Sequence, residues 1–213
     1  MADILINKNI LTEVSNALTD TQCVVLCLQN EACVSVFHRR QRRRCQLHDV
    51  LFLSPQDGEE EAGTVYYSVR TGDCPSGYVH NRLLNFCYQL HTDQKKYNVS
   101  VADCRSRGEY LAVIDSEEKQ NHVTKQIQSS SDTNVSSYFI DGSDAAEEGQ
   151  WVFHDGRKLT YKAWAPGYPL HGTGRNYIVS IKSDNFRWHN SKVAKHDKYY
   201  ICEKNMLNPL PIE

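Results

Sequence analysis

The sequence predicts an α+β protein made of two disulfide-stapled modules. Its 213 residues suit one or two domains, on the usual range of roughly 100–200 residues each. The eight cysteines fall into two groups of four, one in each half of the chain. An even number in each half predicts disulfides and an oxidising compartment. The cysteines are Cys23, Cys27, Cys33 and Cys45, then Cys74, Cys87, Cys104 and Cys202.

Composition excludes several classes of protein. The formal net charge of −2 favours no particular partner. No apolar run approaches the roughly 20 residues of a membrane helix. The first residues lack the basic start and apolar core of a signal peptide, so we expect the numbering to begin near the mature N-terminus. Reduced thiols or zinc ligands are the alternative for the cysteines, but zinc sites favour Cys-x-x-Cys pairs and the chain has none.

The first half predicts one helix and several short strands. In residues 19–30, Cys23 and Cys27 are four positions apart, which places both on one face of a helix. Asp20 or Thr21 is expected to cap this helix. Apolar and β-branched residues predict strands at 33–38, 45–48 and 64–69.

This half resembles the PAN/apple module over roughly residues 1–72. The resemblance rests on the pattern Cys23-x3-Cys27-x5-Cys33-x3-Phe37, followed by Cys45-x-Leu47. It implies the disulfides Cys23–Cys45 and Cys27–Cys33, whereas four cysteines alone permit three pairings. We therefore expect a first domain at 1–72 and a second at 73–213.

The second half predicts two helices and several strands. Residues 100–107 form the first helix, with Ser100 as the expected cap and Asp103 three positions later. Residues 116–127 form the second, with Ser116 as cap and two glutamates at its positive end. Strands are expected at 138–142, 151–153, 177–181 and 198–202.

From Cys74 to Glu203 this half resembles a long-form C-type lectin-like domain. The motifs that carry the resemblance are Cys74-Pro75-Ser76-Gly77-Tyr78, Phe86-Cys87-Tyr88, Ala102-Asp103-Cys104, Leu111-Ala112-Val113-Ile114-Asp115, Trp151, Trp164-Ala165-Pro166-Gly167-Tyr168-Pro169, Trp188-His189-Asn190 and Tyr200-Ile201-Cys202-Glu203. The resemblance implies the disulfides Cys74–Cys87 and Cys104–Cys202. The family's further bridge would fall near Ile178 and residues 193–195, where no cysteine stands, so the long loop is expected to be more mobile or held by packing.

The resemblance also implies a calcium site that this chain has lost. Calcium takes six to eight oxygen ligands and its affinity rises with their negative charge. Lectins of the family supply Glu-Pro-Asn or Gln-Pro-Asp, a further Glu, and Trp-Asn-Asp. This chain has Tyr168-Pro169-Leu170, Asn176 and Trp188-His189-Asn190 instead. We therefore expect no cofactor, and no useful calcium binding at the sugar site.

A metal-free binding surface is the functional interpretation of this region. Aromatic rings stack on sugar C–H faces, while amides and arginine bond to hydroxyls. The same residue types suit protein contacts, and a loop that binds nothing is the third alternative. Trp151 and Trp164 are expected in the core. The predicted carbohydrate-binding residues are Tyr168, His171, Arg175, Asn176, Tyr177, Trp188, His189 and Asn190.

Two further sites are hypotheses. Glu118 and Glu203, with a carbonyl near Ala112, match a structural calcium position of some family members, unless they are solvated surface acids. A basic run predicts a polyanion-binding hairpin, because crowded like charges repel each other and some PAN-related modules bind heparin there. Its alternative is a solvated turn neutralised by Glu59, Glu60 and Glu61. The run comprises Arg39, Arg40, Arg42, Arg43 and Arg44.

The chain contains no hydrolase, metalloprotease or phosphate-loop motif, so we predict a binding protein and not an enzyme. The expected function is a secreted, extracellular lectin that recognises glycans or glycoproteins without calcium, in innate immune recognition. The alternatives are a protein-binding or matrix module and a sulfated-polysaccharide binder. Nucleic acid and membrane are not expected partners, and agglutination would need two sites per particle or an oligomer. Asn98 and Asn134 begin glycosylation sequons.

Overall fold

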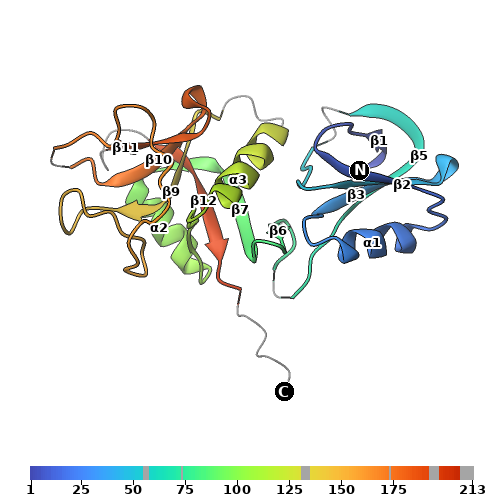
Figure 1. Ribbon diagram of the computed structural model, residues 1–213, viewed down its shortest axis with the longest axis horizontal. Coiled ribbons are helices and arrows are strands. Elements are labelled where there is room, and N and C mark those ends of the chain that lie inside the picture. The colour runs from blue at the N-terminus through green and yellow to red at the C-terminus, as the bar shows by residue number, and fades with distance from the viewer. Residues whose placement is uncertain (55–57, 73, 131–134, 173, 192–196, 207–213) are drawn as a thin grey trace, which may run out of the picture. The chain divides into compact units, whose positions relative to one another are not determined.

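The computed structural model describes residues 1–54, 58–72, 74–130, 135–172, 174–191 and 197–206 (Figure 1). Internal contacts divide the chain into two units, Met1–Cys87 with Lys125–Thr133 and Tyr88–Thr124 with Asn134–Glu213. The domain bounds expected at 72 and 73 stay a prediction. In the described part of the chain, every helix is too short or too polar to cross a lipid bilayer.

The first unit is built on a five-stranded antiparallel sheet in the order β1-β5-β3-β4-β2. Its central strand pairs Phe37 with Gln46 on one side and with Tyr66 on the other. The two N-terminal strands have no counterpart among the predicted elements. The elements are β1 (Ala2–Leu5), β2 (Ile10–Ser15), α1 (Asp20–Gln29), β3 (Ser35–Arg39), η1 (Arg40–Arg42), β4 (Arg44–His48) and β5 (Glu59–Ser68).

Helix α1 turns its cysteine-bearing face toward the sheet, as the four-residue spacing predicts. Cys23 and Cys27 are both fully buried. The predicted cap at Asp20 or Thr21 is wrong: Thr19 has an extended backbone and its hydroxyl accepts a hydrogen bond from the Gln22 amide at 3.1 Å. Asp20 cannot serve because its carboxylate is bonded to Arg40 and to His38.

Four disulfides staple the chain, and they join the same pairs that the two resemblances imply. In the first unit these sulfurs pack with Val36 and Leu47, and they contribute to a core that a module of this size could build only sparsely from apolar side chains alone. The PAN/apple resemblance itself stays a prediction. The disulfides are Cys23–Cys45, Cys27–Cys33, Cys74–Cys87 and Cys104–Cys202.

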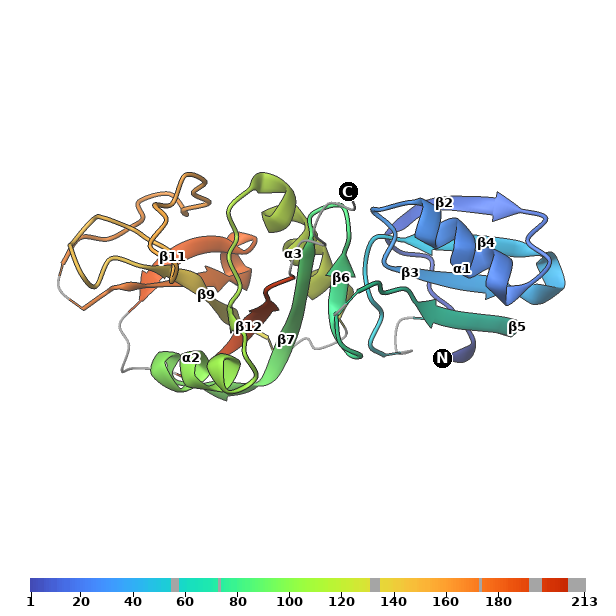
Figure 2. The same cartoon turned by 90° about the horizontal axis from the view of Figure 1, so that it is seen from below.

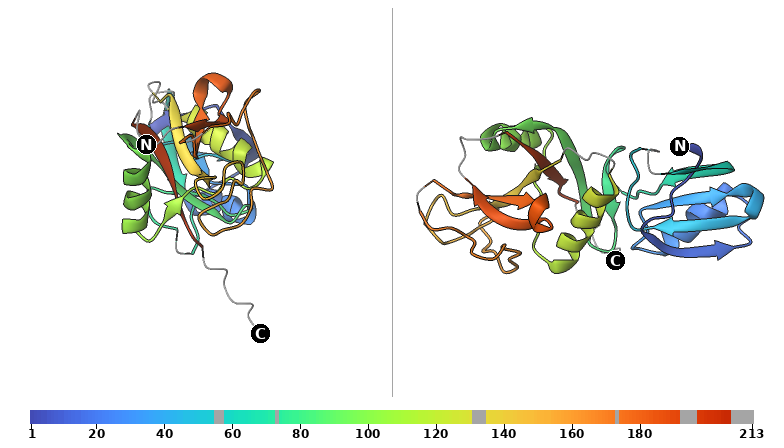
Figure 3. Two further views of the ribbon diagram at one scale, coloured as in Figure 1. Left: turned by 90° about the vertical axis from the view of Figure 1, so that its left-hand side faces the viewer. Right: turned by 90° about the horizontal axis from the view of Figure 1, so that it is seen from above.

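A seven-stranded sheet runs in the order β11-β10-β9-β12-β7-β6, with β8 paired to β12. β12 pairs with β9 in parallel. Helices α2 and α3 lie on opposite sides of this sheet (Figures 2 and 3). The elements are β6 (Val79–Asn81), β7 (Phe86–Lys95), α2 (Tyr97–Ser106), β8 (Tyr110–Leu111), α3 (Glu117–Ser129), β9 (Ser137–Ser143), β10 (Tyr177–Ile181), η2 (Lys182–Asp184), β11 (Arg187–Ser191) and β12 (Lys198–Lys204).

Two of the local predictions for this sheet and its helices are wrong and one is confirmed. Ser100 does not cap α2, because the helix begins at Tyr97 and the buried Ser100 hydroxyl donates to the Lys96 carbonyl. The strand expected at 151–153 is only an isolated bridge at Val152. Ser116 does cap α3, since its hydroxyl accepts a hydrogen bond from the Lys119 amide at 3.2 Å.

Candidate functional site

The side chain of Asn190 holds the long loop between β9 and β10. Asn190 is 4% exposed and lies on β11. Its amide oxygen accepts a hydrogen bond from the Leu170 backbone N–H at 2.7 Å. Its amide nitrogen donates to the carbonyls of Leu170 and Arg175, at 2.7 and 3.0 Å. Oxygen and both amide hydrogens are thus engaged with the loop backbone, so this part of the loop is held by hydrogen bonds from Asn190. Residues 193–195, where the family's further bridge would end, lie outside the described residues.

Trp188 forms part of the core under this loop. It is fully buried, and its indole N–H donates to Gln120 on α3 at 2.8 Å. Backbone hydrogen bonds join it to Ala163 and Ala165 in the loop. Trp188 therefore has no surface for a ligand and leaves the predicted contact set. Trp151 is buried as expected. Trp164, which was also expected in the core, is only half-buried and packs edge-on against both other tryptophans.

Tyr177 lies on the opposite face of the sheet from Asn190. Neighbouring residues of a strand face opposite sides of a sheet, and Ile178 is the residue that pairs with Asn190. Tyr177 instead packs against Tyr97 of α2, with ring centroids 3.7 Å apart. The strand residues of the predicted set are therefore split between the two faces of the sheet: Trp188 and Asn190 lie on one face, and Tyr177 and His189 on the other.

The remaining predicted residues form a rim along the loop and the edge strand. Tyr168 and His189 pack ring against ring, with centroids 3.8 Å apart, and the His189 Nε2 bonds to Asp184. His171 is exposed and Arg175 half-buried; neither makes a side-chain hydrogen bond or ion pair with another described residue. The amide oxygen of Asn176 is buried without a hydrogen-bond partner in the described chain. We call Tyr168, His171, Arg175 and His189 the loop rim.

A lysine lies at the position expected for a structural calcium ion. The Lys119 Nζ lies 3.2 Å from the Val113 carbonyl and 3.1 Å from an Asp115 carboxylate oxygen. It is also 3.8 Å from Glu203, whose other carboxylate oxygen accepts the Val113 N–H at 2.8 Å. Burial raises the pKa of Glu203 to about 7, with Lys119 opposing the shift. The other candidate, Glu118, is exposed.

An ammonium group among these oxygens opposes a second cation by charge repulsion. In the described residues, one group of three side chains has metal-ligand spacing, and it consists of His91, Asp103 and Cys202. The Cys202 sulfur is bonded to Cys104, so it cannot act as a thiolate ligand.

The arginine run is largely neutralised within the first unit. Arg39 is 8% exposed, which contradicts the expected cluster of five exposed arginines. Its guanidinium donates to Glu61 at 2.9 Å and to Glu13 at 3.1 Å. The Arg40 partner holds the pKa of the Asp20 carboxyl well below its usual range. Further ion pairs join Arg42 to Glu61, Arg44 to Glu13 and Arg40 to Asp20.

Glu61 is the one residue of the predicted neutralising set, Glu59 to Glu61, for which the described contacts include an ion pair with this run. Glu13 and Asp20 come from β2 and α1, far away in sequence. Arg43 is exposed, adopts a left-handed backbone (φ 52°), and makes no side-chain hydrogen bond or ion pair with another described residue. The arginine run thus leaves one unpaired guanidinium in the described structure.

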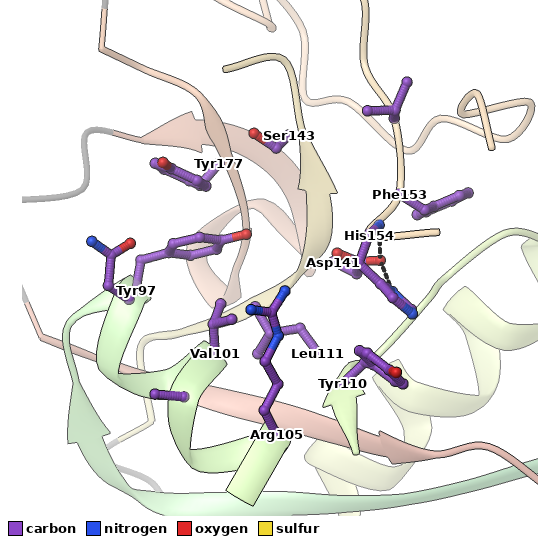
Figure 4. A pocket seen from close by; sticks show the side chains of 13 residues that line it. Tyr97, Val101, Arg105, Tyr110, Leu111, Asp141, Ser143, Phe153, His154 and Tyr177 are labelled. Atoms are coloured by element: carbon purple, nitrogen blue, oxygen red, sulfur yellow. Dashed lines mark hydrogen bonds and ion pairs between the residues drawn. The ribbon is translucent and has the colours of Figure 1, made fainter. Parts of the chain in front are cut away.

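A cavity of about 600 Å³ between α2 and the sheet was not predicted. Figure 4 shows Tyr97, Val101 and Arg105 on one wall, all from one face of α2, with Tyr110 and His154 opposite. Their four-residue spacing on a helix is the signal that could have indicated this wall. The lining residues are Tyr97, Asn98, Val101, Ala102, Arg105, Tyr110, Leu111, Asp141, Ser143, Val152, Phe153, His154 and Tyr177.

Asp141 and His154 form a hydrogen-bonded pair in this cavity. The buried Asp141 carboxylate accepts the His154 backbone N–H at 2.9 Å and its ring Nδ1 at 2.7 Å. This contact raises the pKa of His154. The imidazole also stacks on the Tyr110 ring, with centroids 3.9 Å apart. The predicted glycosylation residue Asn98 is exposed and lines the same cavity, whereas Asn134 lies outside the described residues.

Comparison with known proteins concerns mainly the second half of the chain. The family profile for the Lectin C-type domain matches residues 93–204. The galactose-specific lectin nattectin of Thalassophryne nattereri is 29% identical over 136 residues, covering 64% of this chain and 83% of nattectin. Salivary C-type lectin 1 of Aedes albopictus is 33% identical over 108 residues, covering 47% of this chain and 71% of the mosquito protein.

Solved structures show the same fold. A calcium-independent type II antifreeze protein superposes with a TM-score of 0.54 at 21% identity, over 63% of this chain and 96% of the antifreeze protein. The C-type lectin CEL-I of Cucumaria echinata gives a TM-score of 0.56 at 20% identity, over 62% of this chain and 97% of CEL-I.

Proposed function

The chain belongs to the C-type lectin domain family, and from this premise we propose that it binds glycans at the loop rim without calcium. The family assignment favours a carbohydrate-binding protein and not an enzyme. The finer statements, that the loop rim is the binding surface and that no metal takes part, rest on the residues of the long loop.

One observation carries the proposal: the Asn190 amide is committed to the backbone of the loop. A calcium ion would need that oxygen together with several others, preferably charged. Leu170 offers no side-chain oxygen, and the nearby Asp184 carboxylate is bonded to His189. A loop that is already held by an amide can present its rim without a metal.

The loop rim has the chemistry that sugars require. The Tyr168 and His189 rings offer an aromatic face for the C–H side of a pyranose. Arg175 and His171 supply donors for hydroxyl groups. Because nattectin is described as galactose-specific, β-galactosides are the first probes.

A glycan array with calcium and with EDTA tests the proposal. We expect the same glycans to bind in both buffers, and we expect Tyr168→Ala to weaken binding by about tenfold, the loss of roughly 1.4 kcal/mol of stacking. Leu170→Ala is the matched control, since Leu170 is an exposed neighbour without a ring. An empty array, or binding that EDTA abolishes, would refute the proposal.

The same experiment distinguishes the alternative functions. An empty array with salt-sensitive retention on heparin would favour a sulfated-polysaccharide binder, since salt screens exposed charges. Loss of that retention in Arg43→Gln would assign it to the arginine run, whose other members are paired. An empty array without retention would favour a protein-binding or matrix module.

We further propose that the protein acts outside the cell, in innate immune recognition. The four disulfides support an oxidising environment. The measurement is the thiol content of the native protein, which should be zero; free thiols would contradict the extracellular assignment.

A further inference from the structure

We propose that the cavity between α2 and the sheet binds a small organic anion, an acidic head group on an apolar body. This site is separate from the loop rim, and no step of its argument depends on glycan binding. Three properties support it: the size of the cavity and its apolar lining side chains, an unpaired guanidinium in its lining, and an acidic lining residue that is already hydrogen-bonded to a histidine.

The cavity has the size and character of a small-molecule site. Its volume of about 600 Å³ lies within the usual range of roughly 300–1,000 Å³ for ligand pockets. Val101, Leu111 and Phe153 provide apolar surface in its lining, and Tyr97 and Tyr177 pack against each other there. Burying an apolar ligand body against these side chains is favourable in water.

Arg105 supplies the anion-binding group. Its side chain extends between Tyr97 on one side and Tyr110 with His154 on the other (Figure 4). The Arg105 side chain is exposed and makes no hydrogen bond or ion pair with another described residue. A guanidinium binds a carboxylate or sulfonate through two parallel hydrogen bonds. An arginine without an internal partner can make both of them with a ligand.

Asp141 is already engaged by His154, which contacts its carboxylate through the backbone N–H and the ring Nδ1. It is the one acidic residue in the described lining, and both hydrogen bonds from His154 fall on the same carboxylate oxygen. Asp155 and Glu203, which also influence His154, line the adjacent hollow together with Lys119 and Arg157. The described lining of the cavity therefore holds one unpaired guanidinium and one carboxylate that is hydrogen-bonded to a histidine.

A matched pair of ligands tests the requirement for the anion. The probes are 4-phenylbutyrate and the neutral 4-phenylbutan-1-ol, titrated into the deglycosylated full chain and followed by ¹H–¹⁵N NMR. We expect the acid to shift the amide signals of α2 and of residues 152–154. We expect the alcohol to bind about tenfold more weakly, because it lacks the charge-assisted hydrogen bonds.

Variants place the ligand in the cavity. Arg105→Gln should weaken binding of the acid by about tenfold, whereas Arg187→Gln, at an exposed arginine on β11, should not change it. Ala102→Trp, an exposed lining position, should abolish binding of both probes by filling the cavity. The NMR spectra report whether each variant is folded.

Three results would overturn the proposal. Equal affinity for the acid and the alcohol would show that the cavity selects no charge. Equal weakening in both arginine variants would indicate general attraction to basic side chains. The absence of any shift at 10 mM 4-phenylbutyrate, a concentration far above that of a useful site, would show that the cavity does not bind this chemical class.

Discussion

The arginine run of the first unit and the cavity beside α2 use arginine in opposite ways. Five arginines lie within residues 39–44, yet four of them make ion pairs with Glu13, Asp20 or Glu61. Arg105 has one arginine close by in the sequence, the ion-paired Arg107. The Arg105 guanidinium itself has no ion pair or hydrogen bond to another described residue. The comparison shows that the density of charge in the sequence does not tell which guanidinium is free to bind a partner.

The long loop follows the same rule. Trp188 and Asn190 have the residue types of a binding site. Trp188, however, is a core residue, and the Asn190 side chain is hydrogen-bonded to the backbone of the loop. The side chains of Tyr168 and Arg175 have fewer contacts within the fold, so they remain able to contact a ligand. Polar groups that hold the fold and polar groups that bind partners should therefore respond differently to substitution and to pH.

The largest expected effect is the acid sensitivity of the first unit, whose ionisable groups we infer to be structural. His48 is fully buried, its Nδ1 bonds to the Lys8 carbonyl at 2.9 Å, and its ring packs edge-on against Phe37 and Phe52. Burial lowers the pKa of His48 from 6.5 to about 4. Above pH 6.5 neither the folded nor the unfolded state is protonated. As the pH falls toward 4, the unfolded state gains the proton first, so stability is lost across this window.

The shift corresponds to a loss of about 3 kcal/mol between pH 7 and pH 4. Hydrogen exchange of peptides from β3 and β4 measures this loss of stability. The exchange rates are compared at pH 7.0 and 4.5 after correction for the intrinsic rate of amide exchange at each pH. His48→Phe should flatten the pH dependence because it keeps an aromatic ring without a proton-binding site. An unchanged pH profile in this variant would assign the acid sensitivity to other groups.

Sequence patterns predicted what depends on local spacing. The four-residue interval between Cys23 and Cys27 identified the buried face of α1, and Ser116 was correctly recognised as the cap of α3. Resemblance to two families implied the disulfide pairs that the structure contains.

Tertiary contacts decided the rest. The partners of Arg39 come from β2 and β5, more than twenty positions away on either side, and no local pattern indicates them. The direction of Tyr177 depends on the register between β10 and β11, since a strand alone does not specify which face meets the loop. The cavity joins α2 to the segment 152–154, so it exists only after folding.

A second prediction concerns Arg39, the buried member of the arginine run. Arg39→Met should destabilise the first unit by about 2–3 kcal/mol, because it leaves the half-buried carboxylates of Glu13 and Glu61 with fewer cations. Arg42→Met is the control: its side chain is 62% exposed and also pairs with Glu61, so we expect a change of about 0.5 kcal/mol or less. Urea unfolding followed by far-UV circular dichroism measures both. Equal losses in the two variants would contradict the structural role of Arg39.

The smallest expected effect is at the long loop and bears on calcium. Asn190→Ala removes the three hydrogen bonds that tie Leu170 and Arg175 to β11. Because Leu170 is 38% exposed, water can replace part of what is lost, so the expected cost is about 1–2 kcal/mol. Leu170→Ala, which keeps the backbone contacts, is the matched control and should cost less.

Limited proteolysis should then cut the loop of Asn190→Ala faster than that of the control. Added calcium should protect neither Asn190→Ala nor Leu170→Ala from cleavage. The Asn190 amide of the control is bonded to the loop backbone, and neither protein has a carboxylate at position 190 to bind the ion. Protection of the wild-type loop by calcium would show instead that Asn190 exchanges its backbone partners for a metal. The contrast between paired and available side chains that the arginine run illustrates would then not extend to this loop.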